Sequence, residues 1–197
     1  MICAQVLHAA HPALDGAARA AACAADACGR FSETGRALSN VGPGLGAPTA
    51  AAAAALVARR RAAGAKTAGS LLAGYLLGVQ GFAQVVKAAT ARARPDQLHH
   101  ATYSFPSLHT ATAVYMAGAL LCVLAPALLA GDDDPSEGPP WRWTPAAAGG
   151  VASLGAATAA GRVLTESHWL SDTVAGAALG VAALAAAVAL ANDADAR

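Results

Sequence analysis

The amino-acid sequence predicts an all-α fold, an antiparallel transmembrane helix bundle with five clear apolar helices. Hydrophobic residues make up 56% of the 197-residue chain and charged residues only 13%, with a mean hydropathy of +0.44, whereas soluble domains carry about a quarter charged residues. Five runs lack Asp, Glu, Lys, Arg and His, and their lengths suit the roughly 17–25 residues that cross a bilayer as a helix. The runs are 37–58, 67–86, 110–130, 143–161 and 173–191. A soluble Ala-rich bundle is the alternative, but five such runs are hard to bury in one small chain.

The first 36 residues carry too many charges to predict a spanning helix. Asp15 and Arg19, like Asp26 and Arg30, are spaced i,i+4, which supports a solvated or interfacial helix face. The segment lacks the basic start, apolar core and cleavage pattern of a secretory signal, and its acidic residues argue against a transit peptide. We therefore divide the chain into an amphipathic or interfacial N-terminal segment of uncertain placement (1–36), a helix-bundle domain (37–192) and a polar tail (193–197).

The apolar runs differ in strength. Runs 67–86 and 110–130 are Leu-rich and are the strongest predictions, whereas run 37–58 is interrupted by two prolines. Two small-residue pairs, Gly74-x3-Gly78 and Gly176-x3-Gly180, would let helices approach closely in lipid. Chance explains these pairs about as well in so Gly- and Ala-rich a chain, so they predict no oligomeric state.

The linkers between the runs are polar. A basic turn, Arg59-Arg60-Arg61 with Lys66, follows the first run. In the loop 131–142, the adjacent acids Asp132–Asp134 are typical of a solvated loop rather than a metal site. A net charge of +1 and the lack of a basic tract with aromatics indicate no nucleic-acid partner.

Four cysteines lack zinc-ligand spacing, namely Cys3, Cys23, Cys28 and Cys122. Buried or free thiols are the default expectation for them. A disulfide between Cys23 and Cys28 would require that this end of the protein face an oxidising compartment.

Three short clusters of phosphate-handling residues stand at the ends of the apolar runs. They are Lys87-x6-Arg94-Pro95, Pro106-Ser107-Leu108-His109 and Arg162-x5-His168-x3-Asp172. If the runs alternate in direction, all three clusters lie at one end of the bundle, whereas random placement would scatter them over both faces. This arrangement predicts one site that can displace a phosphoryl group without a metal.

The third cluster supplies the predicted reacting groups. His168 and Asp172 share a helix face, so the carboxylate can accept from one ring nitrogen and leave the other free to attack substrate. Arg162 can offer a fork of donors to phosphate oxygens. Taken alone, a helix-capping His beside a routine Asp is the simpler interpretation.

The other two clusters predict an anion site and a proton donor. Ser107 can cap the following helix, which leaves the backbone N–H groups of Leu108 and His109 at a helix N-terminus, where anions bind. His109 is placed to protonate the departing oxygen. Lys87 and Arg94 flank a helix exit, where snorkelling of basic side chains at the membrane interface is the alternative.

Together the clusters resemble the pattern of the type 2 phosphatidic acid phosphatases and their relatives, the vanadium haloperoxidases. That pattern is Lys-x6-Arg-Pro, Pro-Ser-Gly-His and Ser-Arg-x5-His-x3-Asp, and the match covers residues 87–172. The resemblance implies a bundle of antiparallel helices, commonly six in membrane members, and metal-independent phosphoester hydrolysis through a phosphohistidine, with no cofactor. It implies His168 as the nucleophile, Asp172 as its orienting group and His109 as the general acid. The implied phosphate-binding residues are Lys87, Arg94, Ser107, Leu108 and Arg162.

Two positions depart from the family pattern. Leu108 replaces a Gly whose backbone amide approaches phosphate, and Gly161 replaces the Ser before Arg162. Leu keeps the amide but adds bulk on the leaving-group side. Because Pro-Ser-Leu-His also resembles a version found in some lipid phosphotransferases, a transferase is an alternative to a hydrolase.

We therefore predict an integral membrane phosphatase that acts on a lipid phosphate or diphosphate, of the phosphatidate or prenyl diphosphate type. A soluble acid phosphatase or haloperoxidase is the alternative enzyme, and a structural membrane protein with a decayed site is the alternative without activity. The expected partners are the lipid substrate and the membrane. Because the basic turn at 59–66 falls on the opposite face, the positive-inside tendency predicts a site on the extracytoplasmic or lumenal face.

Overall fold

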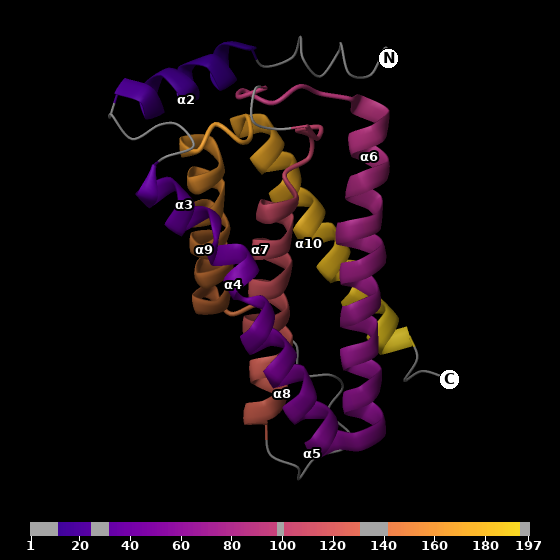
Figure 1. Ribbon diagram of the computed structural model, residues 1–197. Coiled ribbons are helices and arrows are strands. Elements are labelled where there is room, and N and C mark those ends of the chain that lie inside the picture. The colour runs from indigo at the N-terminus through magenta and orange to yellow at the C-terminus, as the bar shows by residue number, and fades with distance from the viewer. Residues whose placement is uncertain (1–11, 25–31, 98–100, 131–141, 194–197) are drawn as a thin grey trace.

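The computed structural model describes residues 12–24, 32–97, 101–130 and 142–193, and over these ranges the chain is helical without a strand (Figure 1). The predicted all-α bundle is confirmed. Its helices are α2 (Pro12–Ala24), α3 (Glu33–Ser39), α4 (Val41–Gly44), α5 (Gly46–Ala73), α6 (Phe82–Thr90), α7 (Leu108–Gly118), α8 (Ala125–Leu129), α9 (Pro145–Leu164) and α10 (Leu170–Asp193). Two stretches of π-helix, η1 (Gly74–Gly81) and η2 (Ala119–Leu124), continue α5 and α7.

The long helical segments alternate in direction (Figure 1). The chain runs away from the α2 end along α5 and reverses near Arg60, where one apolar segment ends and the next begins at Ala62. It returns through η1 to α6, runs away again through α7 and α8, returns along α9 and leaves along α10. The end of α6, the start of α7 and the α9–α10 connection therefore lie at the same end of the bundle.

Four helical segments in the described ranges are long and apolar enough to cross a membrane. They are Val41–Arg60, Ala62–Thr90, Leu108–Leu129 and Leu170–Asn192. They coincide with four of the five predicted apolar runs, and they indicate an integral membrane protein. The fifth run forms α9, an Ala- and Gly-rich helix that is not among the four.

The centre of the bundle is α7. In the segment Leu108–Leu129, 61% of the most apolar 18-residue stretch is buried. The same share is 17% in each of the first two segments and 39% in the last. Helices α4, α9 and α10 pack around it. On α7, the fully buried Tyr115 donates a hydrogen bond of 2.6 Å to the Leu71 carbonyl oxygen, which ties the central helix to α5.

Both predicted small-residue pairs lie where helices of this chain approach closely. A Cβ on Gly74 would lie 2.6 Å from the Ala187 Cβ, and one on Gly176 would lie 2.3 Å from the Ser107 carbonyl oxygen. The pairs therefore seat η1 and α7 against α10. This close packing brings the start of α7 to the start of α10, where the Ser107 N–H donates to the Asp172 carbonyl oxygen at 2.9 Å.

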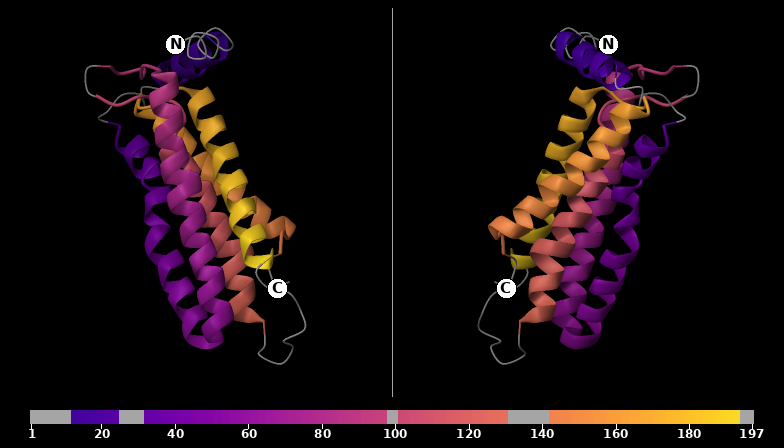
Figure 2. Two further views of the ribbon diagram at one scale, coloured as in Figure 1. Left: turned by 90° about the vertical axis from the view of Figure 1, so that its right-hand side faces the viewer. Right: turned by 90° about the vertical axis from the view of Figure 1, so that its left-hand side faces the viewer.

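Helix α2 lies across this end of the bundle rather than along it (Figures 1 and 2). The predicted pairing of Asp15 with Arg19 on a solvated face is wrong. Asp15 is only 3% exposed and contacts the bundle, while Arg19 pairs with Glu166 at 2.7 Å. Cys23 of α2 is disulfide-bonded, and Cys122 is a buried free thiol. Outside the described residues lie Asp26, Arg30, Cys3, Cys28 and the acidic loop residues Asp132–Asp134.

Candidate active site

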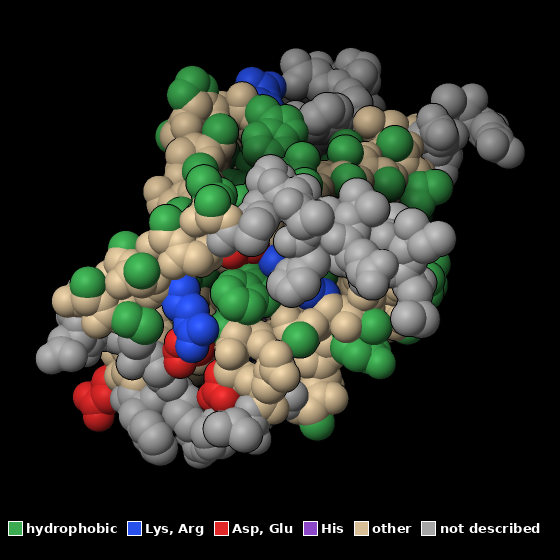
Figure 3. Space-filling view, turned by 90° about the horizontal axis from the view of Figure 1, so that it is seen from above, with side chains coloured by type: hydrophobic (Ala, Val, Ile, Leu, Met, Phe, Trp, Pro, Cys, Tyr) green, Lys and Arg blue, Asp and Glu red, His purple; other side chains and the backbone are tan. Residues whose placement is uncertain are grey.

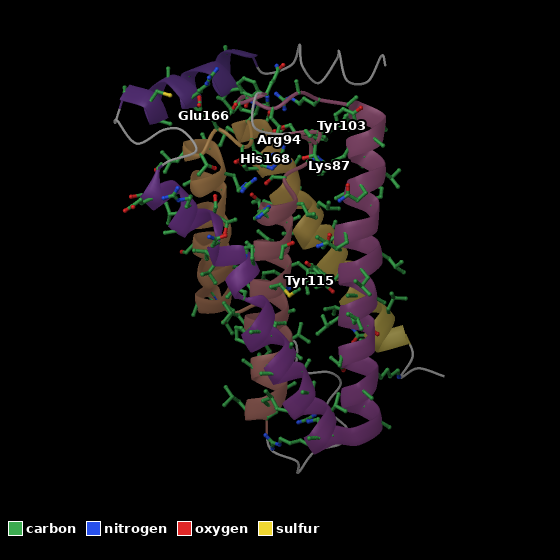
Figure 4. The ribbon with its side chains drawn as sticks, viewed as in Figure 1. Lys87, Arg94, Tyr103, Tyr115, Glu166 and His168 are labelled. Atoms are coloured by element: carbon green, nitrogen blue, oxygen red, sulfur yellow. The ribbon has the colours of Figure 1, made fainter. Side chains whose placement is uncertain are left out.

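The three sequence clusters meet at the end of the bundle that α2 crosses. Figure 4 shows Lys87, Arg94 and His168 grouped there, with Tyr115 deeper in the bundle. Seen from above, basic and acidic side chains gather at this end, between apolar surfaces (Figure 3). The helices therefore bring together residues that are far apart in the sequence.

Lys87 lies in the last turn of α6 and is 7% exposed. Its Nζ donates to the carbonyl oxygens of Tyr103 at 2.9 Å and Ser104 at 3.2 Å. Snorkelling would place the ammonium in water, so this burial contradicts that alternative. An ammonium has three donors, and neither carbonyl partner carries a charge. The Lys87 charge is thus held in place with donor capacity left for an anion.

Arg94 follows α6 and is fixed by two loops. Its Nε donates to the Thr102 carbonyl oxygen at 2.9 Å and its second terminal nitrogen to the Thr102 Oγ1 at 2.9 Å. The first terminal nitrogen donates to the Ser167 carbonyl oxygen at 2.8 Å and lies 3.3 Å from His168 Nε2. Neutral oxygens therefore orient this guanidinium, and its charge is directed at the predicted nucleophile.

The second cluster begins α7 at Leu108, with Ser107 at the N-cap position. The predicted capping by the Ser107 side chain is wrong, since its hydroxyl contacts the Thr110 hydroxyl at 3.1 Å instead of a backbone N–H. The first backbone N–H groups of a helix have no intrahelical acceptor, so this end of α7 can bind an anion. His109 lies in this first turn, and the charges that act on it are those of Arg162, Arg94 and Lys87.

Arg162 lies in the last turn of α9 and has no carboxylate partner in the described part of the chain. Its Nε is buried without a hydrogen-bond partner. Leaving a buried donor atom without a partner is costly, and a bound phosphate would supply both the charge and the acceptors. Arg162 therefore has donor capacity left for a phosphate.

His168 is 2% exposed, in the α9–α10 connection, and its Nδ1 lies 3.4 Å from the Asp172 Oδ2. Because a guanidinium can only donate, the contact with Arg94 requires Nε2 to be the acceptor, so the proton of the neutral ring sits on Nδ1, facing Asp172. Burial lowers the pKa of His168 to about 3, the Arg162 and Arg94 charges act in the same direction, and Asp172 acts in the opposite one. The ring is therefore neutral near pH 7, with the Nε2 lone pair facing the cations.

Asp172 is fully buried and has partners that the sequence did not predict. Its Oδ1 accepts from Arg92 at 2.6 Å, and its Oδ2 accepts from the Trp169 N–H at 3.0 Å and from the Ser104 hydroxyl. Arg92 lies inside the six-residue spacer between Lys87 and Arg94. A charged residue just beyond the end of a helix was the one sequence feature that could have indicated its role. Nothing in the local sequence around Ser104 could have identified it.

The packing also explains both departures from the motif pattern. A Cβ on Gly161 would lie 2.2 Å from the Ser39 nitrogen, because α3 crosses α9 at this point. A Ser side chain has no room there. The Leu108 side chain packs against the main hydrophobic cluster, which includes Leu56 and Tyr115. Its bulk is therefore accommodated by the core of the bundle.

The site is a cluster of three cationic side chains that lack carboxylate partners among the described residues. In the described ranges, neither Lys87, Arg94 nor Arg162 forms an ion pair with a carboxylate, and Asp172 is committed to Arg92 and His168. Over the same ranges, no three His, Cys, Asp or Glu side chains are arranged to hold a metal ion. Three cations, a helix N-terminus and a neutral imidazole suit the binding of a phosphoryl group and attack on it.

Comparison with known proteins agrees with this chemistry. A family model described as the PAP2 superfamily matches residues 68–195, which include all three clusters. Searches of the curated proteins and of the solved structures each gave no match.

Proposed function

Because this chain belongs to the PAP2 superfamily, a family of phosphatases, we propose that it hydrolyses a lipid phosphate or diphosphate at the membrane surface through a phosphohistidine. The observation that carries the proposal is the partly buried Arg162, which has no carboxylate partner among the described residues, beside two further cations and the neutral, oriented His168. Bringing three like charges together is unfavourable, and binding of a phosphate dianion would offset that cost.

The first step would be attack by His168 Nε2 on phosphorus. The N–P bond forms as the bond to the leaving oxygen breaks, and that oxygen takes a proton from His109. Lys87, Arg94, Arg162 and the α7 N-terminus would hold the phosphoryl oxygens as charge develops on them. In the second step water attacks phosphorus, His109 takes its proton, the N–P bond breaks and inorganic phosphate leaves.

A lipid substrate is supported by an apolar groove with a volume of about 510 Å³ on the flank of α9 and α10. Its lining includes Thr110 and Thr173, which lie next to the site because Thr110 contacts Ser107 and Thr173 follows Asp172. Small side chains such as Ala156 and Ala178 and larger apolar ones such as Trp143 line the rest. We assign this groove to the hydrocarbon tail of the substrate.

Two observations favour a site on the extracytoplasmic or lumenal face. Arg59 and Arg60 lie at the opposite end of the bundle, where they donate to the Leu128 and Ala130 carbonyl oxygens, and basic residues favour the cytoplasmic side. Cys23, on the α2 that crosses the site end, is disulfide-bonded, which suits an oxidising compartment.

Phosphate release from phosphatidate and from a prenyl diphosphate, measured on purified protein in mixed micelles, tests the proposal. We expect release from at least one substrate, loss of that release in His168→Ala, and no loss with a metal chelator. Equal release by the variant would exclude the mechanism. Adding an alcohol acceptor tests the transferase alternative, which predicts a phosphorylated alcohol in place of free phosphate. Because the Leu108 side chain packs into the core, we expect hydrolysis to dominate.

A further inference from the structure

Asp15 is a buried carboxylate on a helix whose other described side chains are mostly exposed. It is 3% exposed, whereas the neighbouring Leu14 is 56% exposed. A buried carboxylate is retained only if charge and hydrogen bonds compensate for the water it has lost. Asp15 meets that requirement through residues that are distant in the sequence.

Both oxygens of the Asp15 carboxylate accept hydrogen bonds, from three donors in all. Its Oδ1 accepts from the Ser171 N–H at 2.9 Å, and its Oδ2 accepts from the Ser171 hydroxyl and from an Arg92 terminal nitrogen, both at 2.7 Å. Ser171 lies in the first turn of α10, directly before Asp172. Asp15 therefore joins α2 to the residues that surround the predicted orienting carboxylate.

Arg92 is shared between two carboxylates. One terminal nitrogen donates to Asp15, while the other donates to the Asp172 Oδ1 at 2.6 Å and to the Ser171 hydroxyl at 2.7 Å. The guanidinium is 6% exposed and lies over the Trp169 ring, 5.7 Å from its centroid. Trp169 therefore packs against one face of the guanidinium, and the Asp15 and Asp172 carboxylates bind two of its edges.

This sharing matters because guanidinium groups prefer to bind one carboxylate with both terminal nitrogens. Without Asp15, Arg92 could turn both nitrogens toward Asp172. That arrangement would engage the Asp172 Oδ2, the oxygen that faces the His168 Nδ1 at 3.4 Å. It would also leave the Arg92 charge directed at Asp172 alone, which weakens the carboxylate as an acceptor for the imidazole.

We propose that Asp15 is a positioning residue of the phosphatase site, which engages one edge of Arg92 and so keeps the Asp172 Oδ2 directed at His168. The inference rests on the proposed function, since it assigns Asp172 the role of orienting the nucleophile. In this account α2 is part of the catalytic apparatus although none of its described side chains touches the phosphate-holding cations.

Asp15→Asn tests this role because it keeps the size and one acceptor oxygen, replaces the other oxygen with an NH₂ donor and removes the charge. We expect kcat to fall by about 10–100-fold, the range seen when partners that orient a histidine are lost, with KM nearly unchanged because the phosphate-binding cations stay in place. Asp15→Glu should recover part of the loss. The matched control is Arg19→Gln, which breaks the exposed α2 contact to Glu166 and should leave kcat unchanged. If both variants lose activity equally, α2 merely needs to be docked and the inference is wrong.

A double-mutant cycle with Asp172→Asn separates positioning from general damage. If Asp15 acts through Asp172, adding Asp15→Asn to Asp172→Asn should change kcat by less than 2-fold, a marked failure of additivity for neighbours in one network. If the kcat losses of the two single variants instead multiply in the double variant, the inference is wrong. If Asp15→Asn does not fold, Ser171→Ala is the substitute, because it removes the hydroxyl that bonds to both Asp15 and Arg92 and keeps the charges of those two residues. It should give a smaller kcat loss of the same kind. An inactive wild-type protein would count against the proposed function instead, and an active wild type with normal Asp15 variants would count against this inference alone.

Discussion

Restoring the family residue at position 161 should destabilise this protein. A Cβ there would lie 2.2 Å from the Ser39 nitrogen and 2.7 Å from the Gly35 carbonyl oxygen. Both are backbone atoms, so they cannot rotate away as a side chain would. Gly161→Ser therefore forces α3 away from α9.

The size of the effect follows from two opposing contributions. Inserting atoms into a packed interior costs about 1–3 kcal/mol, and a backbone neighbour favours the upper half of that range. Replacing a helical Gly with Ser recovers about 0.5 kcal/mol of helix propensity. The remaining loss of about 1.5–2.5 kcal/mol corresponds to a fall in Tm of about 3–10 °C for a chain of this length.

The assay is a thermal melt of purified protein in one detergent, with Gly149→Ser as the matched control. Gly149 lies on the same helix and a Cβ there meets nothing within 4 Å, so this variant receives the propensity gain without the clash. We expect it to melt at or slightly above the wild-type temperature. Equal Tm values for the two variants would refute the packing explanation for Gly161.

Three further predictions concern the site. A neutral His168 is required for attack, and burial lowers its pKa to about 3, so the acid limb of the kcat/KM profile for a soluble phosphomonoester should lie well below pH 6.5. Asp172 raises this pKa, so Asp172→Asn should move the limb to still lower pH, and a limb near 6.5 in the wild type would contradict the burial argument. Arg162→Met should reduce phosphate release by about 10²–10³-fold without lowering Tm, because it removes a cation whose buried Nε has no hydrogen-bond partner. Arg94→Met should instead lower both phosphate release and Tm, because it leaves several carbonyl and hydroxyl acceptors without their donor. A large Tm loss in Arg162→Met would show that the Arg162 guanidinium is already paired. Ala156→Trp, which fills the apolar groove, should reduce kcat/KM for a long-chain lipid phosphate and leave a soluble phosphomonoester unaffected. Ala182→Trp, on an exposed position of α10 outside the groove, is its control, and equal effects of the two variants would place the tail elsewhere.

The helices were predictable because lipid imposes a simple rule on composition. Runs without charge must be helical where they cross a bilayer, and charged motifs at their ends can only lie at the membrane surfaces. Alternation of direction then brought Lys87, Ser107 and His168 to one end of the bundle. No long-range contact had to be known for that inference.

The contacts that complete the site depend on tertiary packing and were not predictable. Asp15 and Arg19 have the spacing of a surface pair, but α2 lies across the bundle, where Asp15 pairs with Arg92 and Arg19 pairs with Glu166. Arg92 and Ser104 reach Asp172 through loops whose course no periodicity fixes. The absence of a Ser at position 161 is explained only by the crossing of α3, which is a long-range contact.

The central claim is that His168 becomes phosphorylated during turnover. Rapid acid-free quenching of the enzyme with a radiolabelled lipid phosphate, followed by peptide mass spectrometry, measures this directly. We predict an acid-labile phosphoryl group on His168 that forms and decays at rates consistent with kcat, and that is absent from His168→Ala. Steady phosphate release with no phosphoryl group on His168 at any time, or with the group on another residue, would contradict the account.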